Sequence, residues 1–292
     1  IGDSPLLDMT PSKRRFREIA VYLGAFAVIP LIFIMVTNTD YTDLFMYIIG
    51  PAVVLYFIYI TSRIKDKIAR KKLYAAFILT LFSILFFALF EQAGGSLALF
   101  ASENVEHKLL FFTMDPNVVN NGANSLYVIS FAPLLGMIWL ALDKKKKNPN
   151  TVAKFAMAFV FLAGSFAIFY ICRFFLNSDG MASLNMFALA YLVMTIGELC
   201  LSPIGLSMIT KLSPHNLAGM MMGMWFLASA YGQYLAGIIG ASIALPDKNA
   251  SKMELLNSYT DGYLQLALYA IIAAIVIFSL VKVIRKLMHD VE

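Results

Sequence analysis

Two glutamates lie inside long apolar stretches of the chain, Glu91 in ILFFALFEQAGGSLALF and Glu198 in FALAYLVMTIGELCLSPIGL. A carboxylate in the middle of a membrane-spanning helix costs about 2.5 to 3.5 kcal/mol on translocon-insertion scales. A chain that keeps two of them is therefore expected to use them, because a buried carboxylate can hold an ammonium group or take up a proton. A static charge pair between helices is the alternative role.

Apolar runs long enough to cross a membrane surround these glutamates. Hydrophobic residues make up 60% of the chain and charged residues 14%, whereas soluble proteins average about 25% charged. About 20 apolar residues span the hydrocarbon core as a helix. Pro30, Pro51, Pro133 and Pro203 lie inside such runs and predict kinks rather than helix ends. Because the runs lack the period of two typical of barrel strands, they predict eight spanning helices, at roughly 19–36, 44–61, 73–100, 119–142, 152–176, 183–210, 217–243 and 261–284.

The distribution of positive charge predicts the orientation of these helices. All but four of the 23 lysines and arginines lie before the first run, after the last run, in alternate connections between runs, or within one turn of these segments, as Lys154 and Lys282 do; the exceptions are Lys108, Arg173, Lys248 and Lys252. The positive-inside rule then places both ends of the chain in the cytoplasm. The net charge of +5 reflects this topology and contact with anionic membrane lipid, so nucleic acid is not an expected partner.

Cysteines and histidines point to no further chemistry. Cys172 and Cys200 lie on predicted spanning helices, where a small hydrophobic role is expected. His107, His215 and His289 lie at or beyond helix ends without the spacing of metal ligands. We predict neither a metal site nor a cofactor. An intramembrane enzyme would need a catalytic dyad at membrane depth, and the sequence offers none, so an enzyme is not expected.

The chain begins IGDSPLLDMT, without an initiator methionine or the pattern of a signal peptide. We therefore expect an upstream segment to be missing.

The predicted helices fall into two groups. Residues 1–17 are predicted to form a cytoplasmic basic segment, 18–72 a helix pair and 73–292 a six-helix bundle. The first and fourth helices of the bundle each carry one of the two glutamates, as a three-plus-three inverted repeat would produce.

Glycines mark where one of these helices is expected to touch its neighbours. Gly219 and Gly223 in GMMMG, followed by Gly232, Gly237 and Gly240, allow close backbone approach between helices. Static packing and a sliding surface are both compatible with this pattern.

Four segments together resemble one transporter family. FEQAGGSL, NSLYVISFAPLLG, YLVMTIGELCLSPIGLSMITKLSP and GMMMGMWFLASAYGQYLAG resemble the seventh, eighth, tenth and eleventh helices of the proton-coupled oligopeptide transporters, a branch of the major facilitator superfamily. The resemblance covers about residues 73 to 285 and implies an all-α membrane protein built as the C-terminal half-bundle of that fold. The two preceding helices resemble the linker pair that prokaryotic members insert between their halves, which implies a prokaryotic plasma (inner) membrane. The family's N-terminal half, with its ExxER-type motif, has no counterpart in this sequence.

The resemblance implies roles for three glutamates. Glu91 takes the position of the proton-responsive carboxylate that pairs with an arginine of the N-terminal half. Glu198 takes the position of the glutamate that receives the amino terminus of a peptide. Glu103 is a candidate for the extracellular gate, where a solvated surface charge is the alternative. The basic partners of all three would lie in the N-terminal half.

The resemblance also implies substrate contacts for uncharged residues. Asn124 falls where an asparagine hydrogen-bonds the peptide, and Ser202 and Trp225 match positions that line the pocket. The alternatives are a hydrogen bond between helices for Asn124, a bond to its own helix for Ser202, and a core or interfacial position for Trp225. Asn121 departs from the family, which commonly has glutamine there, and this puts the local shape of the pocket in doubt.

These implications predict a proton-coupled symporter of di- and tripeptides. A short peptide is a zwitterion with a backbone amide, so a buried carboxylate suits its ammonium end and an asparagine suits its amide. Its expected partners are peptides, protons, membrane lipid and the N-terminal half of the same transporter. The alternatives are a transporter of another small zwitterion or anion, such as an amino acid or nitrate, and an accessory membrane subunit without transport of its own.

Overall fold

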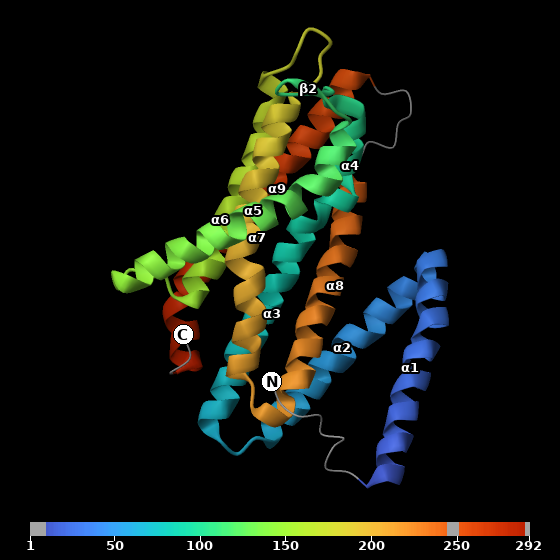
Figure 1. The fold of residues 1–292 in the computed structure, drawn as a ribbon, viewed down its shortest axis with the longest axis vertical. Helices are drawn as coiled ribbons and strands as arrows, with labels where there is room; N and C mark the ends of the chain where they lie inside the picture. The colour runs from blue at the N-terminus through green and yellow to red at the C-terminus, as the bar shows by residue number, and fades with distance from the viewer. Residues whose placement is uncertain (1–9, 244–250, 290–292) are drawn as a thin grey trace. The chain divides into compact units, whose positions relative to one another are not determined.

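The computed structural model describes residues 10–243 and 251–289 and divides the chain into two compact units, Ile1–Ile60 and Thr61–Glu292 (Figure 1). The division falls before the boundary predicted at residue 72. In the first unit, α1 spans Pro11–Thr37, so it begins within the basic segment predicted at residues 1–17. Helix α2 (Thr39–Arg63) follows after a single residue. None of the residues of α1, all of which are described, is buried.

The second unit contains the remaining elements, which are almost entirely helical. A short antiparallel hairpin pairs Lys108 with Thr113 and Leu109 with Phe112. In chain order the elements are α3 (Lys67–Phe90), η1 (Glu91–Gly94), α4 (Ser96–Asn104), β1 (Lys108–Leu109), β2 (Phe112–Thr113), α5 (Pro116–Lys144), α6 (Thr151–Ile171), η2 (Cys172–Phe174), α7 (Leu184–Leu212), η3 (His215–Leu217), α8 (Ala218–Ile243) and α9 (Lys252–Met288).

The eight predicted spans are present, and one of them is interrupted. Among the described residues, eight helical segments are long and apolar enough to cross a membrane. All four internal prolines lie within helices, as predicted, rather than at their ends. The run at 73–100, however, is not one continuous helix, because α3 ends at Phe90 and a 3-10 turn separates it from α4. The turn is held by contacts to α8 that hydropathy does not reveal.

Helices α6, α7 and α9 supply much of the interior of the second unit, and α6 lies between the other two. Helix α6 packs along α7 and α9, while α3 packs along α8 and α5 along α7. Figure 1 shows α5 crossing the bundle obliquely and the hairpin lying at the end opposite the C-terminus of α9. Large aromatic side chains fill the interior, and their edge-on and stacked contacts stabilise it beyond the burial of their area. Those that are fully buried include Phe86, Phe100, Phe155, Phe159, Phe166, Phe169, Phe187, Tyr191 and Tyr263.

The glycines of α8 do not all serve the same purpose. A Cβ at Gly232 would overlap the Cβ of Phe87 and lie 3.1 Å from the carbonyl oxygen of Ile84, so this glycine lets α8 approach α3 closely. At Gly219, Gly223 and Gly237 an added Cβ would meet nothing within 4 Å. The close approach expected from the pattern is therefore confirmed at Gly232 but not at these three positions.

Candidate functional site

The interruption after Phe90 brings Glu91 to the start of an irregular stretch of backbone. Gly95 follows the 3-10 turn with φ −129° and ψ −112°, outside the helical region. A Cβ at Gly240 of α8 would lie 3.3 Å from the backbone nitrogen of Ser96 and 3.6 Å from the Cα of Gly95. The absence of side chains at Gly95 and Gly240 thus allows α8 to lie directly against the turn.

Gln92 links the turn to the backbone of α3 and of α8. Its side chain is fully buried, and Nε2 donates hydrogen bonds to the carbonyl oxygens of Ala88 and Ala236, each at 3.2 Å. Its Oε1 accepts the hydroxyl of Ser96 at 2.9 Å. Since polar backbone in a membrane must find partners within the protein, Gln92 explains how the turn persists between two apolar helices.

Glu91 itself is only partly buried. Its Oε1 accepts a hydrogen bond from Nε2 of Gln233 on α8 at 3.4 Å. Within the described residues no lysine or arginine forms an ion pair with Glu91, Glu198 or Glu103; the salt bridges there join Arg14 to Glu18 and Arg173 to Asp261. An ionised carboxylate has acceptor sites on both oxygens, so Glu91 retains capacity to bind a cation.

A chain of hydrogen bonds leads from the turn to α7. Nδ2 of Asn120 on α5 donates to the carbonyl oxygen of Ala93 at 3.0 Å, and Oδ1 of Asn120 accepts the hydroxyl of Tyr191. Both side chains are buried. One turn further along α7, the hydroxyl of Thr195 donates to the carbonyl oxygen of Tyr191 at 2.8 Å. Helices α5 and α7 are thereby tied together beside the turn that carries Glu91.

Asn124 and Glu198 meet at the end of this chain of hydrogen bonds. Nδ2 of Asn124 donates to Oε2 of Glu198 at 2.8 Å and to Oγ1 of Thr195 at 3.3 Å. Both Asn124 and Glu198 are half-buried, whereas Thr195 is fully buried. The structure therefore brings together two predicted site residues from α5 and α7. Oδ1 of Asn124 makes no hydrogen bond to a described residue and is available as an acceptor.

Ser202 and Trp225 occupy less open positions. Trp225 is 4% exposed and stacks edge-on against Phe155, and a Cβ at Gly205 would collide with its ring. Trp225 thus packs in the interior between α6 and α7, which is the core position considered as its alternative. Oγ of Ser202 is buried and has no hydrogen-bond partner among the described residues. It does not bond to its own helix, contrary to the alternative reading of this serine.

Glu103 lies away from the other glutamates, at the end of α4. It is exposed, and its Oε2 accepts a hydrogen bond from the hydroxyl of Tyr259 on α9 at 3.1 Å. Nearby, the guanidinium of Arg173 pairs with Asp261 and donates to Oδ1 of Asn257 at 2.7 Å. Polar contacts thus join α4 and η2 to the first turns of α9, but among the described residues none joins Glu103 to the Asn124–Glu198 pair.

Four residues of this polar region were not predicted from the sequence: Gln92, Asn120, Tyr191 and Thr195. A signal for three of them exists, because Asn120 lies four residues before Asn124 and Tyr191 and Thr195 precede Glu198 on one helical face. Gln92 directly follows Glu91, yet its contact with Ala236 joins segments far apart in the sequence. No local pattern predicts that contact.

The comparisons with known proteins agree on one family. Residues 32–256 match the POT family profile, PTR2. The peptide transporter YePEPT of Yersinia enterocolitica subsp. palearctica is 33% identical over 268 residues, which cover 91% of this chain and 50% of that protein. The dipeptide and tripeptide permease B of Salmonella typhimurium is 29% identical over 276 residues, 94% of this chain and 56% of the permease.

Solved structures show the same fold. A bacterial homologue of the human drug peptide transporters PepT1 and PepT2 matches with a TM-score of 0.74 and 27% identity, over 98% of this chain and 57% of that one. A peptide transporter POT in complex with sulfate matches with a TM-score of 0.73 and 23% identity, over 96% and 55%. The chain spans about half the length of the curated relatives it matches.

The comparisons confirm the all-α membrane fold and the resemblance recognised in the four sequence segments. The matched relatives are transporters rather than enzymes. Eight apolar helices and these relatives identify a multi-pass membrane protein. Because the family profile matches more than half of its length, this chain belongs to the POT family.

Proposed function

We propose that this chain forms the C-terminal half of a proton-driven symporter of di- and tripeptides. The observation that carries the proposal is the hydrogen bond of 2.8 Å between Asn124 and Glu198, which joins a carboxylate and an amide on two spanning helices. Membership of the POT family supports transport, and the names of the matched relatives favour peptides over other small zwitterions or anions. Their length, about twice that of the matched region, supports a second half as partner.

Glu198 is the proposed site for the amino terminus of the peptide. An ionised carboxylate and an ammonium group form a short, charge-assisted hydrogen bond, which is about twice as strong as a neutral one. Asn124 supplies a free carbonyl oxygen beside it for the peptide N–H. The unpartnered hydroxyl of Ser202 on the same helix is a further candidate contact. Trp225, being buried, acts through the packing of α7 at Gly205.

Glu91 is the proposed proton-coupling residue, and Glu103 the proposed gate residue. Among the described residues, Glu91 has a single hydrogen-bond partner, the amide of Gln233 at 3.4 Å, so its carboxylate is open to a cation. A cation of the second half that approaches and withdraws as the halves rock would make Glu91 release and bind a proton. Glu103, at the end of α4, is exposed and able to meet a cation at the outer mouth.

The orientation and location form part of the same proposal. Both ends of the chain lie in the cytoplasm, and the protein resides in the plasma (inner) membrane of a prokaryote. The bias of lysine and arginine toward alternate connections supports this orientation. A single cysteine placed at position 146, in the connection between α5 and α6, should react with a membrane-impermeant maleimide only after the cytoplasmic face is opened.

Glu198→Gln in the complete transporter tests the peptide site. The variant should lose affinity for peptides with a free amino terminus by about tenfold, and for N-acetylated peptides much less, because only the former present an ammonium group. Glu106→Gln is a matched control, since Glu106 accepts a hydrogen bond from Asn177 in a connection outside the site. Equal losses for both kinds of peptide would identify Glu198 as structural.

Reconstitution of the chain tests the partnership. Residues 1–292 alone in liposomes should neither accumulate peptide nor bind it appreciably. Their carboxylates form one side of the proposed site, and the N-terminal half would form the other side. Co-expression with the N-terminal half of a close relative should restore uptake. Proton-driven uptake by this chain alone would contradict the proposal of a second half, and binding without transport would support the accessory-subunit alternative.

A further inference from the structure

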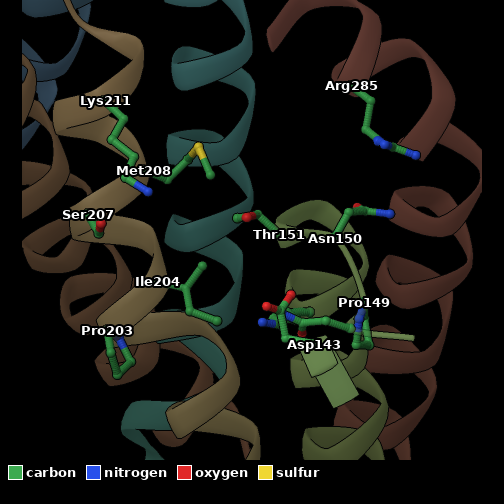
Figure 2. Close-up of a pocket in the computed structure, with 12 residues that line it drawn as sticks. Asp143, Pro149, Asn150, Thr151, Pro203, Ile204, Ser207, Met208, Lys211 and Arg285 are labelled. Carbon is green, nitrogen blue, oxygen red and sulfur yellow. The ribbon is translucent and has the colours of Figure 1, made fainter. Parts of the chain in front are cut away.

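A cavity of about 540 Å³ lies between the ends of α5, α6, α7 and α9, apart from the Asn124–Glu198 pair. Its volume is within the range of small-molecule sites, about 300 to 1,000 Å³. It lies at the end of the bundle that the distribution of positive charge predicts to face the cytoplasm. Figure 2 shows Lys211 and Arg285 on opposite sides of the cavity, with Asn150 and Thr151 between them.

The charged side chains that line the cavity are mainly cationic. Lys154, Lys211 and Arg285 contribute positive charge, and Asp143 contributes the one carboxylate among the described lining residues. Nδ2 of Asn148 donates to Asp143 at 3.4 Å. Neither Lys154 nor Lys211 forms an ion pair with any residue that the structure describes. Among the described lining residues, positive charges therefore exceed negative charges by two.

Lys154 is the most deeply buried of these cationic side chains. It is only 9% exposed, and its Nζ lies 4.6 Å from the centre of the Trp139 ring of α5. The contact stabilises the ammonium group but does not neutralise it. The charge of Asp143 acts on this ammonium group without forming an ion pair with it, so the cost of burying the lysine is only partly offset. An anion in the cavity would reduce that cost further.

The first turn of α6 adds donors to the same wall. Asn150 caps the helix by accepting the backbone N–H of Ala153 at 3.0 Å, and Thr151 begins the helix within the cavity lining. The backbone N–H groups at the start of a helix favour phosphate oxygens through both hydrogen bonds and the helix dipole. Lys154 lies one turn further along α6. The ammonium group of Lys154 and the first backbone N–H groups of α6 thus face the same cavity.

We propose that this cavity binds a phosphate group, held by Lys154, Lys211, Arg285 and the start of α6. Two sources present this chemistry at a cytoplasmic membrane surface: the headgroup of an anionic phospholipid and free inorganic phosphate. Basic pockets between spanning helices are suited to lipid headgroups, and an excess of two positive charges suits a phosphate. The proposal does not depend on the peptide site, because the cavity shares no residue with it.

Binding is tested on the full chain in nanodiscs of phosphatidylcholine. In one arm inorganic phosphate is titrated at constant ionic strength. In the other, phosphatidylglycerol replaces part of the lipid, and retained lipid is counted by native mass spectrometry. The rise in the thermal unfolding midpoint is measured in both. Lys154→Gln and Lys211→Gln should each weaken binding about tenfold, as expected for loss of a charge-assisted hydrogen bond.

Lys282→Gln is the matched control, because Lys282 is exposed on α9 near the same end and does not line the cavity. Lys211→Gln removes an exposed side chain, so it decides the test if Lys154→Gln does not give a monodisperse protein. Protection by phosphate that both site variants weaken supports a free-anion site, and selective retention of phosphatidylglycerol supports a lipid site. No protection in either arm, or equal losses in the site variants and Lys282→Gln, overturns the proposal.

Discussion

Two polar regions of the second unit differ in how completely their side chains are hydrogen-bonded within the protein. At the turn after α3, the amide of Gln92 is fully buried and both its nitrogen and its oxygen bond within the protein. On the face shared by α5 and α7, Asn124 and Glu198 are half-buried and bond to each other with capacity left over. The first arrangement stabilises an irregular backbone, and the second leaves groups ready for a ligand.

The packing around the two regions differs in the same sense. Gly232 and Gly240 of α8 lie against α3 and the turn so closely that a Cβ would touch backbone or side-chain atoms. On the same helix Gly223 and Gly237 face open space. In this protein the buried polar groups thus lie where helices are in close contact. A transport surface instead needs polar side chains that lack a hydrogen-bond partner within the protein in at least one conformation.

Glu91→Gln should have the largest effect on transport. In the complete transporter, it should abolish accumulation driven by a pH gradient, because an amide cannot carry the coupling proton. Exchange of peptide at equal pH on both sides should stay measurable, since the Asn124–Glu198 contact is unchanged. Uptake of labelled dipeptide into liposomes with and without a gradient measures both. Normal accumulation by the variant would show that Glu91, like Gln92, only stabilises the turn.

Gly232→Ala should have the largest effect on stability. Its Cβ would overlap that of Phe87 and lie 3.1 Å from the backbone nitrogen of Ala88, and overpacking of this kind costs about 1 to 3 kcal/mol. Gly237→Ala, on the same helix with nothing within 4 Å, should leave the free energy of unfolding unchanged or slightly raised, because alanine favours helix. Unfolding in mixed SDS micelles compares the two. Equal stabilities would refute the distinction between packed and open glycines.

Thr195→Val should reduce peptide affinity moderately. The change keeps the shape of the side chain but removes the hydroxyl that accepts from Asn124 and donates to Tyr191. Hydrogen bonds between membrane helices average about 0.6 kcal/mol, so we expect roughly a threefold rise in Kd. Thr210→Val is the control, because Thr210 bonds to its own helix at Ser207. If both variants bind peptide like the parent protein, Thr195 does not position Asn124.

Tyr259→Phe should have the smallest effect. The hydroxyl donates to Glu103 at 3.1 Å, but Glu103 is exposed and water replaces the lost partner. The free energy of unfolding should fall by about 0.5 kcal/mol, and uptake should change less than twofold. Glu103→Gln serves as the comparison in the same uptake assay, because it removes the proposed gate charge itself. A large loss of uptake in Tyr259→Phe would show that the orientation of Glu103 controls gating.

The membrane architecture follows from local features of the sequence. Hydropathy and segment length depend on local composition, so the eight spans and the prolines inside them were predicted correctly. The presence of Glu91 and Glu198 within spans followed for the same reason. Asn124 was recognised through its motif, whereas its neighbour one turn earlier, Asn120, was not, because its partners Ala93 and Tyr191 lie on other segments.

Contacts between helices determine which of these polar residues meet and which are buried by packing. The span at 73–100 is apolar and contains no proline, yet it breaks at Glu91 because Gln92 reaches Ala236 and Gly240 admits the turn. Likewise, Trp225 is buried because Gly205 on another helix leaves room for its ring. These contacts join residues far apart along the chain. Their energies depend on how the helices pack, which local composition does not specify.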